Sequence, residues 1–354
     1  MADDGTTGGP EPGSSEETLR LAAAVRGSDE TAALEAVEAL ASRPPVQAFT
    51  FLWEAVASAS QSVREAIVGA LNRIDAEALA LLGRRALDSS SASDRLIGIA
   101  VVSVSEGRPA PLLAASLDDP SEDVRTAALR ALLGRRDRSV LDTVGERMTD
   151  PLPHIRGLAV EVLARSNDDR ALPFLLEGAR DPDVQVRDTA REALLGWRSP
   201  VLVDLLLQGL ESPTHRRASS ELLIALGDRA WERMISELAS AGPPTRRAIG
   251  DVLNAAGARE RLVQDLEARG PDARRRAVEA LGAMRAGDAV GELVLRLQDP
   301  AAGVRAKTAQ ALGDIGGEAA LAALRHAMVS DPDMEVVSAI EHALRKLSGE
   351  APNL

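Results

Sequence analysis

The amino-acid sequence predicts an all-α fold, a right-handed solenoid of about eleven antiparallel helix hairpins. Three observations lead to this prediction: a string that recurs about every 31 residues, two helical patterns in each period, and a core made of small and aliphatic side chains. Apolar residues form 45% of the 354-residue chain, but aromatic residues only 2%. Such a composition suits close-packed helices better than a sheet sandwich.

The recurring string consists of a turn, an apolar residue followed by Arg, a small residue, and a closing Ala-Leu-type pair. Residues 119–132 read DPSEDVRTAALRAL, 150–163 read DPLPHIRGLAVEVL, and 181–194 read DPDVQVRDTAREAL. The last position of the string returns at spacings of 27 to 32 residues, at Leu40, Leu71, Val102, Leu132, Leu163, Leu194, Leu226, Leu253, Leu281, Leu312 and Leu344. A period that covers nearly the whole chain indicates a repeat array.

Each period holds two helices. In residues 171–197, ALPFLLEGAR has apolar residues at helical spacing, DPD interrupts the pattern, and VQVRDTAREALLGW resumes it. Pro is tolerated in the first turn of a helix and the Asp before it is a good N-cap. Gly after the second helix predicts a left-handed stop at Gly134, Gly196, Gly227, Gly257 and Gly313.

The pattern DP-x-x-x-[VI]-R-x-x-A-x-x-AL resembles HEAT repeats, specifically the short bacterial type that also occurs in phycobilisome lyases. The best copies are residues 119–132, 150–163, 181–194 and 299–312, and the resemblance covers about residues 15–347. It implies an α-solenoid. It implies little about function, because this repeat serves many unrelated roles.

The chain is expected to form one solenoid over residues 14–347, between a disordered acidic tail (1–13) and a short C-terminal tail (348–354). Ser14 to Glu17 fit a capping box that opens the first helix. Within the solenoid we expect degenerate repeats over 14–105, regular repeats over 106–227, shortened Arg-rich repeats over 228–285, and regular to capping repeats over 286–347.

The recurring acidic and basic residues allow two interpretations, an anion-binding ladder or a structural one that links neighbouring repeats. The structural interpretation is favoured, because a catalytic residue need not recur in every repeat, and in the HEAT proteins that the chain resembles the ladder is structural. The predicted ladder comprises Asp119, Arg125, Asp150, Arg156, Asp181, Arg187, Asp299 and Arg305.

Several function classes lack support in the residues. Without Cys there are no disulfides, thiolate nucleophiles or Cys-based metal sites. The four histidines form no HExxH or HxH motif, and no nucleophile elbow or phosphate-binding loop is present, so we expect no cofactor, no metal and no catalytic residue. No apolar run approaches a membrane helix and the N-terminal stretch lacks a signal-peptide core, which predicts a soluble, cytoplasmic and bacterial protein.

One stretch stands out in charge. The chain carries a net charge of −13, yet residues 214–285 contain thirteen Arg against ten acidic residues. The candidate partner-binding residues are Arg216, Arg217, Arg246, Arg247, Arg274, Arg275 and Arg276. Arg247 and Arg275 hold equivalent positions and predict a short positive stripe. The alternative is a solvated helix face with Arg247/Asp251 and Arg275/Glu279 pairs.

These observations predict a non-enzymatic scaffold that binds a partner protein, with an acidic partner segment, or the chain's own acidic tail, docked on the arginines. An accessory subunit of a lyase-type or other enzyme remains the alternative. A nucleic-acid module is less favoured, because an acidic chain repels phosphate and its Trp53, Trp197 and Trp231 lie far apart in repeat order.

Overall fold

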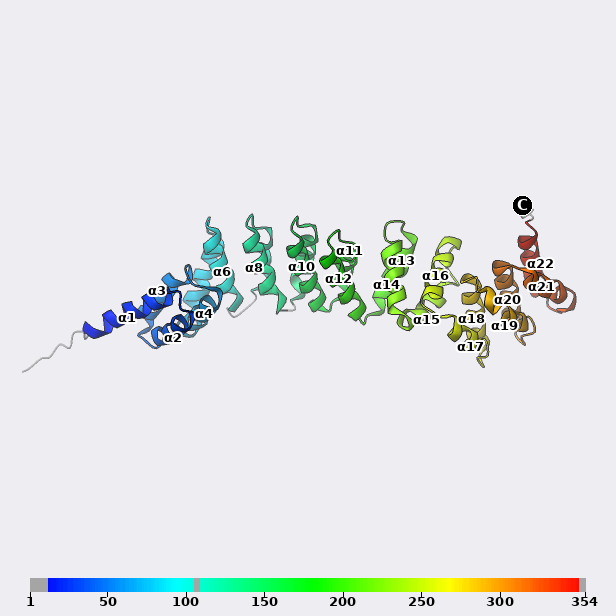
Figure 1. The fold of residues 1–354 in the computed structure, drawn as a ribbon, viewed down its shortest axis with the longest axis horizontal. Helices are drawn as coiled ribbons and strands as arrows, with labels where there is room; N and C mark the ends of the chain where they lie inside the picture. Colours follow the sequence, from blue (N-terminus) through cyan, green and yellow to red (C-terminus); the bar gives the residue numbers. More distant parts are fainter. Residues whose placement is uncertain (1–11, 105–108, 136, 350–354) are drawn as a thin grey trace, which may run out of the picture. The chain divides into compact units, whose positions relative to one another are not determined.

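The computed structural model describes residues 12–104, 109–135 and 137–349. These residues form twenty-two α-helices and five short 3₁₀ segments, with no strand among them (Figure 1). The predicted all-α class is confirmed, and in the described part of the chain the helices follow one another as eleven hairpins. The predicted tails fall mostly on residues 1–11 and 350–354, which lie outside the described ranges.

The chain divides into two compact units, residues 1–193 and 194–354. In the first unit each hairpin has a first and a second helix. The first helices are α1 (Pro12–Val25), α3 (Pro45–Val56), α5 (Ala76–Leu87), α7 (Ala110–Ala115), α9 (Leu141–Glu146) and α11 (Leu172–Gly178). The second helices are α2 (Glu30–Ala41), α4 (Gln61–Ile74), α6 (Ala92–Val104), α8 (Glu122–Leu133), α10 (Pro153–Ser166) and α12 (Val184–Gly196), whose last residues belong to the second unit. Short 3₁₀ segments flank the later first helices, at η1 (Ser116–Asp118), η2 (Arg138–Val140), η3 (Arg147–Thr149) and η4 (Asp169–Ala171).

The second unit continues the same alternation. Its first helices are α13 (Pro200–Glu211), α15 (Asp228–Glu237), α17 (Arg259–Asp265), α19 (Val290–Arg296, preceded by η5, Gly287–Ala289) and α21 (Glu318–Ser330). Its second helices are α14 (Arg216–Leu226), α16 (Pro243–Ala255), α18 (Pro271–Ala283), α20 (Ala302–Ile315) and α22 (Met334–Ser348). In both units successive second helices pack against one another, as α8 does against α10 and α18 against α20, and second helices pack against the first helix of their hairpin, as α6 does against α5 and α14 against α13.

The second helices carry the core of each unit. In α8, Val124, Ala128 and Leu132 are all buried, because residues spaced by four lie on one helix face. The closing Leu or Val of the string is buried in every second helix except the last, where Leu344 is half-buried. Burial of this aliphatic stripe against both neighbours is what makes one hairpin depend on the next.

The Asp-Pro turn lies farther from the helix than the sequence suggested. The carboxylate of Asp119 accepts the N–H of Ser121 at 2.8 Å, and α8 begins only at Glu122, so Asp119 shapes the turn and does not cap the helix. Asp150 and Asp299 make the same contact with the N–H two residues on, at 3.0 and 2.9 Å. Holding the carboxylate outside the helix leaves both of its oxygens able to accept hydrogen bonds from another repeat.

The predicted glycine stops are correct at Gly227 and Gly257, whose φ angles are +56° and +74°. They are wrong at Gly134, Gly196 and Gly313, none of which has a positive φ. Gly313 lies inside α20, and a Cβ there would come within 2.7 Å of the Ala343 Cβ in α22. That glycine is therefore required by close packing between successive second helices.

Candidate functional site

The recurring Arg and Asp side chains join consecutive repeats. Arg274 in α18 donates from Nε and Nη2 to both carboxylate oxygens of Asp299, at 2.7 and 2.8 Å, and from Nη1 to the carbonyls of Ala268 and Arg269, at 2.8 and 3.1 Å. The planar guanidinium thus binds its own turn and the next one together. The other pairs of this kind are Arg95–Asp119, Arg125–Asp150, Arg156–Asp181 and Arg305–Asp331.

These pairs are shielded from water. Burial by itself raises the pKa of Asp299, but hydrogen bonds from Arg274 and from the Ala301 N–H outweigh it, and the pKa lies below its ordinary value. Asp119 and Asp181 show the same balance. Burial is again the largest single influence and raises the pKa, but the hydrogen bonds and the nearby arginine charges together outweigh it, so the pKa of each lies below its ordinary value. Asp119, Asp181 and Asp299 are therefore ionised at neutral pH.

Arg187 differs from the other predicted ladder residues. Its Nη1 donates to the carbonyls of Asp181 and Pro182, at 2.5 and 3.2 Å, as in the regular repeats. Among the described residues it has no carboxylate partner within 4.0 Å. The regular pairs are 24 to 26 residues apart, and 25 residues beyond Arg187 the sequence has Ser212 in place of Asp.

Two of the predicted partner-binding arginines are engaged inside the stack. Arg274 belongs to the ladder, and Arg246 in α16 donates to the Leu238 carbonyl at 2.6 Å and to the Glu279 carboxylate at 3.3 Å. Glu279 in α18 is only 6% exposed and also accepts from Lys307 in α20, at 3.4 Å. The suggested Arg275/Glu279 pair is absent for this reason, and Arg275 contacts Asp272 instead, at 3.3 Å.

The remaining arginines of the predicted set lie at the surface. Arg216 and Arg217 open α14, where Arg216 donates to the Leu210 carbonyl at 2.8 Å and Arg217 pairs with Glu221 at 3.0 Å. Arg247 and Arg276 are exposed, and neither has an ion-pair partner among the described residues. The suggested Arg247/Asp251 pair does not form there.

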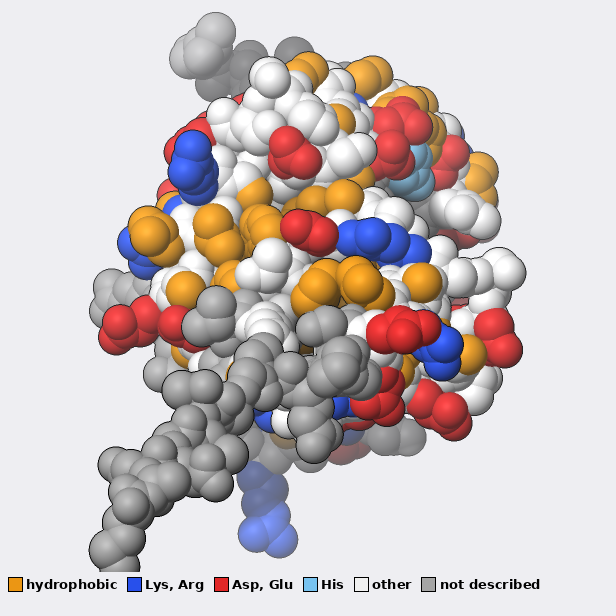
Figure 2. Space-filling view, turned by 90° about the vertical axis from the view of Figure 1, so that its left-hand side faces the viewer, with side chains coloured by type: hydrophobic (Ala, Val, Ile, Leu, Met, Phe, Trp, Pro, Cys, Tyr) orange, Lys and Arg blue, Asp and Glu red, His pale blue; other side chains and the backbone are white. Residues whose placement is uncertain are grey.

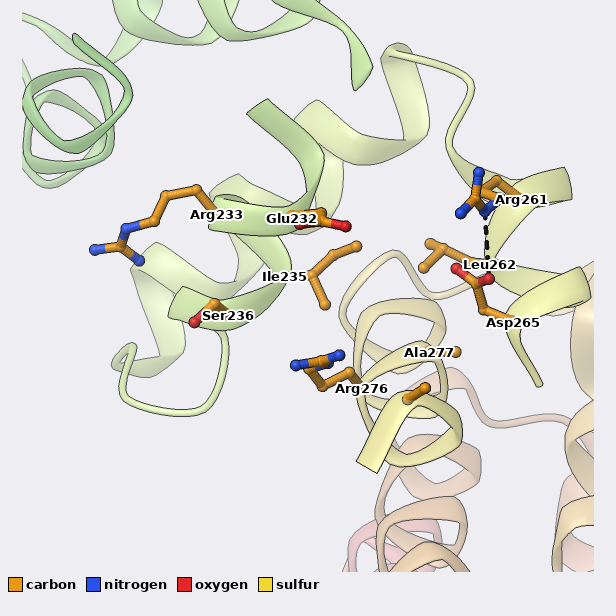
Figure 3. Close-up of a pocket in the computed structure, with 10 residues that line it drawn as sticks. Glu232, Arg233, Ile235, Ser236, Arg261, Leu262, Asp265, Arg276 and Ala277 are labelled. Carbon is orange, nitrogen blue, oxygen red and sulfur yellow. Dashed lines mark hydrogen bonds and ion pairs between the residues drawn. The ribbon is translucent and has the colours of Figure 1, made fainter. Parts of the chain in front are cut away.

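Arg276 lines a groove of about 580 Å³ between α15, α17 and α18 (Figure 3). In Figure 3 its side chain extends from α18 toward Ile235 of α15, with Leu262 of α17 on the far side of the groove. The lining residues are Glu232, Arg233, Ile235, Ser236, Arg261, Leu262, Asp265, Ala273, Arg276 and Ala277. The groove therefore combines an aliphatic lining with charges of both signs.

The other charged side chains of the groove differ in whether they form ion pairs. Arg261 pairs with Asp265 one helical turn on, at 3.3 Å. Arg233 points away from the cavity in Figure 3 and pairs with Asp204 and Glu237, each at 2.7 Å. Glu232 is exposed and, like Arg276, forms no ion pair within the described residues. Arg276 and Glu232 are thus the charged groups available to a ligand.

Sequence reasoning selected Arg276 but missed the α15 and α17 residues that complete the groove. Ile235 and Leu262 belong to first helices, which show no recurring string. The available signal was the reduced spacing of 27 and 28 residues between Leu226, Leu253 and Leu281.

The described residues contain no group of three or more His, Asp or Glu side chains placed to hold a metal ion. They also include no helix that combines the length and apolar character needed to cross a membrane. The three tryptophans lie on separate elements: Trp53 lines a different groove in the first unit, of about 770 Å³, while Trp197 is buried and Trp231 half-buried in the second. None of them lines the Arg276 groove.

Helix hairpins joined by buried Asp–Arg pairs define an α-solenoid repeat protein. The family model for HEAT repeats matches residues 109–195 and 259–345. The chain therefore contains HEAT repeats in these two regions, which confirms the resemblance carried by the Asp-Pro strings.

Solved structures similar to this chain include Kap121p bound to Ste12p, with 13% identity, coverage of 94% of this chain and 45% of that one, and a TM-score of 0.45. Kap121p bound to Nup53p has 14% identity, coverage of 97% and 46%, and a TM-score of 0.45. An engineered protein has 16% identity, coverage of 95% and 100%, and a TM-score of 0.36. The chain spans less than half the length of the Kap121p chains. Among curated proteins, none matches it.

Proposed function

We propose that the protein is a non-enzymatic scaffold that binds a partner protein on the helix surfaces of its repeats, in the cytoplasm of a bacterium. The observation that carries this proposal is that its arginines fall into two groups, those bound within the stack and those free at the surface. Those that recur with the repeat are bound to carbonyls of the stack and, in most repeats, to a carboxylate as well, as Arg274 is. Arg247 and Arg276 on neighbouring second helices are instead exposed and unpaired in the described structure. Side chains fixed on rigid helices are well placed to recognise a protein segment.

Charge favours a protein over a nucleic acid as the partner. The chain carries a net charge of −13, and carboxylates lie close to the free arginine, with Glu232 and Asp265 in the same groove. The face of the molecule in Figure 2 likewise shows acidic, basic and apolar side chains intermixed. A phosphate backbone requires a continuous basic surface, which such a mixture does not supply.

The test is to offer the full chain short random peptides in a display selection, and DNA duplexes and single strands in a separate binding assay. We expect peptides to be enriched and to bind in titration at about 0.15 M salt, and DNA not to bind. DNA binding that falls steeply with salt and disappears in an Arg247→Glu, Arg275→Glu variant would overturn the proposal. Failure to enrich any peptide would also count against it.

A further inference from the structure

We propose that the groove between α15, α17 and α18 is a docking site for an extended peptide segment with one acidic side chain beside an aliphatic one. This inference rests on the proposed scaffold function and specifies where and what it binds. The peptide's carboxylate would pair with Arg276, and its aliphatic side chain would cover Ile235.

Arg276 has different surroundings from its two neighbours in sequence. Successive residues of an α-helix point about 100° apart, so Arg274, Arg275 and Arg276 face different surroundings. Arg274 binds Asp299 of the next repeat and Arg275 contacts Asp272 of its own first turn. Arg276 reaches the groove and has no carboxylate among the described residues. A guanidinium in that position can bind an incoming carboxylate through two parallel hydrogen bonds.

The lining of the groove beside Arg276 is aliphatic. Ile235 is half-buried, Leu262 is only 2% exposed, and Ala273 and Ala277 line the same cavity. An aliphatic side chain laid on Ile235 would remove apolar surface from water and exclude water from the neighbouring ion pair. A cavity of about 580 Å³ is large enough for a few side chains, so the occupant is a short segment.

Two carboxylates on the walls of the groove favour a peptide with a single acidic residue. Glu232 lies on the wall formed by α15, exposed and without an ion pair in the described structure. Asp265 lies on the opposite wall, already paired with Arg261. A run of acidic residues or of phosphates would meet these carboxylates, whereas one carboxylate placed at Arg276 would not. The groove therefore fits a mixed acidic and aliphatic segment.

The test measures the peptides selected on the full chain by calorimetric titration against single variants. Arg276→Glu should weaken binding roughly tenfold or more, and Ile235→Ala should weaken it severalfold. Glu232→Gln should leave binding of a peptide with one acidic residue nearly unchanged and should strengthen binding of a peptide with a second acidic residue, a relaxation that a purely structural role of Glu232 would not produce. Arg325→Ala is the matched control, because Arg325 is an exposed arginine of the same unit outside the groove, and its variant should bind as the unmodified protein does.

Each outcome separates the groove from the broader function. Peptides that bind tightly but respond equally to Arg276→Glu and Arg325→Ala would overturn the groove and leave the scaffold function standing. Selected peptides without an acidic residue would also overturn it. Absence of any bound peptide would remove the scaffold function itself. Unchanged helical content and thermal midpoint in each variant would establish that a loss of binding is not a loss of fold.

Discussion

Arg274 donates two hydrogen bonds to the carboxylate of Asp299 in the following repeat, and the Asp299 side chain has no exposed surface. The same arginine holds two carbonyls of its own turn. One side chain therefore binds two hairpins in a single register. The pair links the local turn to the stacking of the repeats.

Asp299→Ala should destabilise the protein strongly. It leaves Arg274 without its carboxylate in a shielded site, and an unpaired charge there should cost more than the loss of an exposed pair. Urea unfolding followed by circular dichroism measures the effect, as a lower midpoint. The control is Arg217→Ala, whose side chain is 93% exposed and whose pair with Glu221 should be worth less than about 1 kcal/mol. Equal midpoints for the two variants would contradict a structural ladder.

Acid should weaken the ladder in a defined pH range. The pKa of Asp299 is lower in the folded protein than in the unfolded chain, so its contribution is present above about pH 4, the unfolded pKa, and is lost as pH falls through the lower folded pKa. Asp119, Asp181 and Asp331 also have lowered pKa values and should act in the same direction.

The measurement compares the urea midpoints of the unmodified protein and Asp299→Asn between about pH 7 and pH 2. The asparagine variant cannot ionise at this position, so the gap between the two proteins should shrink as the pH falls below about 4. A gap that stays constant across the range would show that ionisation of Asp299 contributes nothing.

The stack could be predicted from sequence because the interactions that form it recur. Val124, Ala128 and Leu132 show their helical face through spacing alone, and the same face returns in each repeat. The partners of individual charges could not be predicted in this way. Glu279 is four residues after Arg275, which suggested a pair on one helix, but its carboxylate is buried against Arg246 and Lys307 from the helices on either side.

The groove was predictable only in part for a similar physical reason. A charge run locates Arg276 on a helix, but the run does not show which of its arginines is free. Arg274 pairs with Asp299 of the next repeat and Arg275 with Asp272 of its own helix, which leaves Arg276 at the groove. The packing role of Gly313 could not be predicted either, because it also depends on contact between elements. Gly313 follows the closing Leu312 of its repeat, as a stop residue would, yet it lies within α20.

Gly250→Ala should destabilise the protein although alanine is the better helix former. A Cβ at Gly250 in α16 would lie 2.1 Å from the Ala283 carbonyl oxygen in α18, so one helix must shift. Such overpacking costs about 1 to 3 kcal/mol, which exceeds the gain of about 1 kcal/mol from helix propensity. Gly303→Ala is the control, since nothing lies within 4 Å of the Cβ that this substitution adds, and its urea midpoint should rise slightly. A rise for both variants would show that the two helices separate freely.

The buried Glu279 carboxylate should couple two cations that lie on different helices. It accepts from Arg246 of α16 and Lys307 of α20 while only 3% of its side chain is exposed, so each cation helps to offset the cost of burying the same charge. A double-mutant cycle with Arg246→Ala and Lys307→Ala, read from urea midpoints, should therefore be non-additive by about 0.5 kcal/mol or more. The second substitution should cost more than the first, because it removes the last partner. Strict additivity, or an effect abolished by high salt as for an exposed pair, would mean that the three side chains act independently.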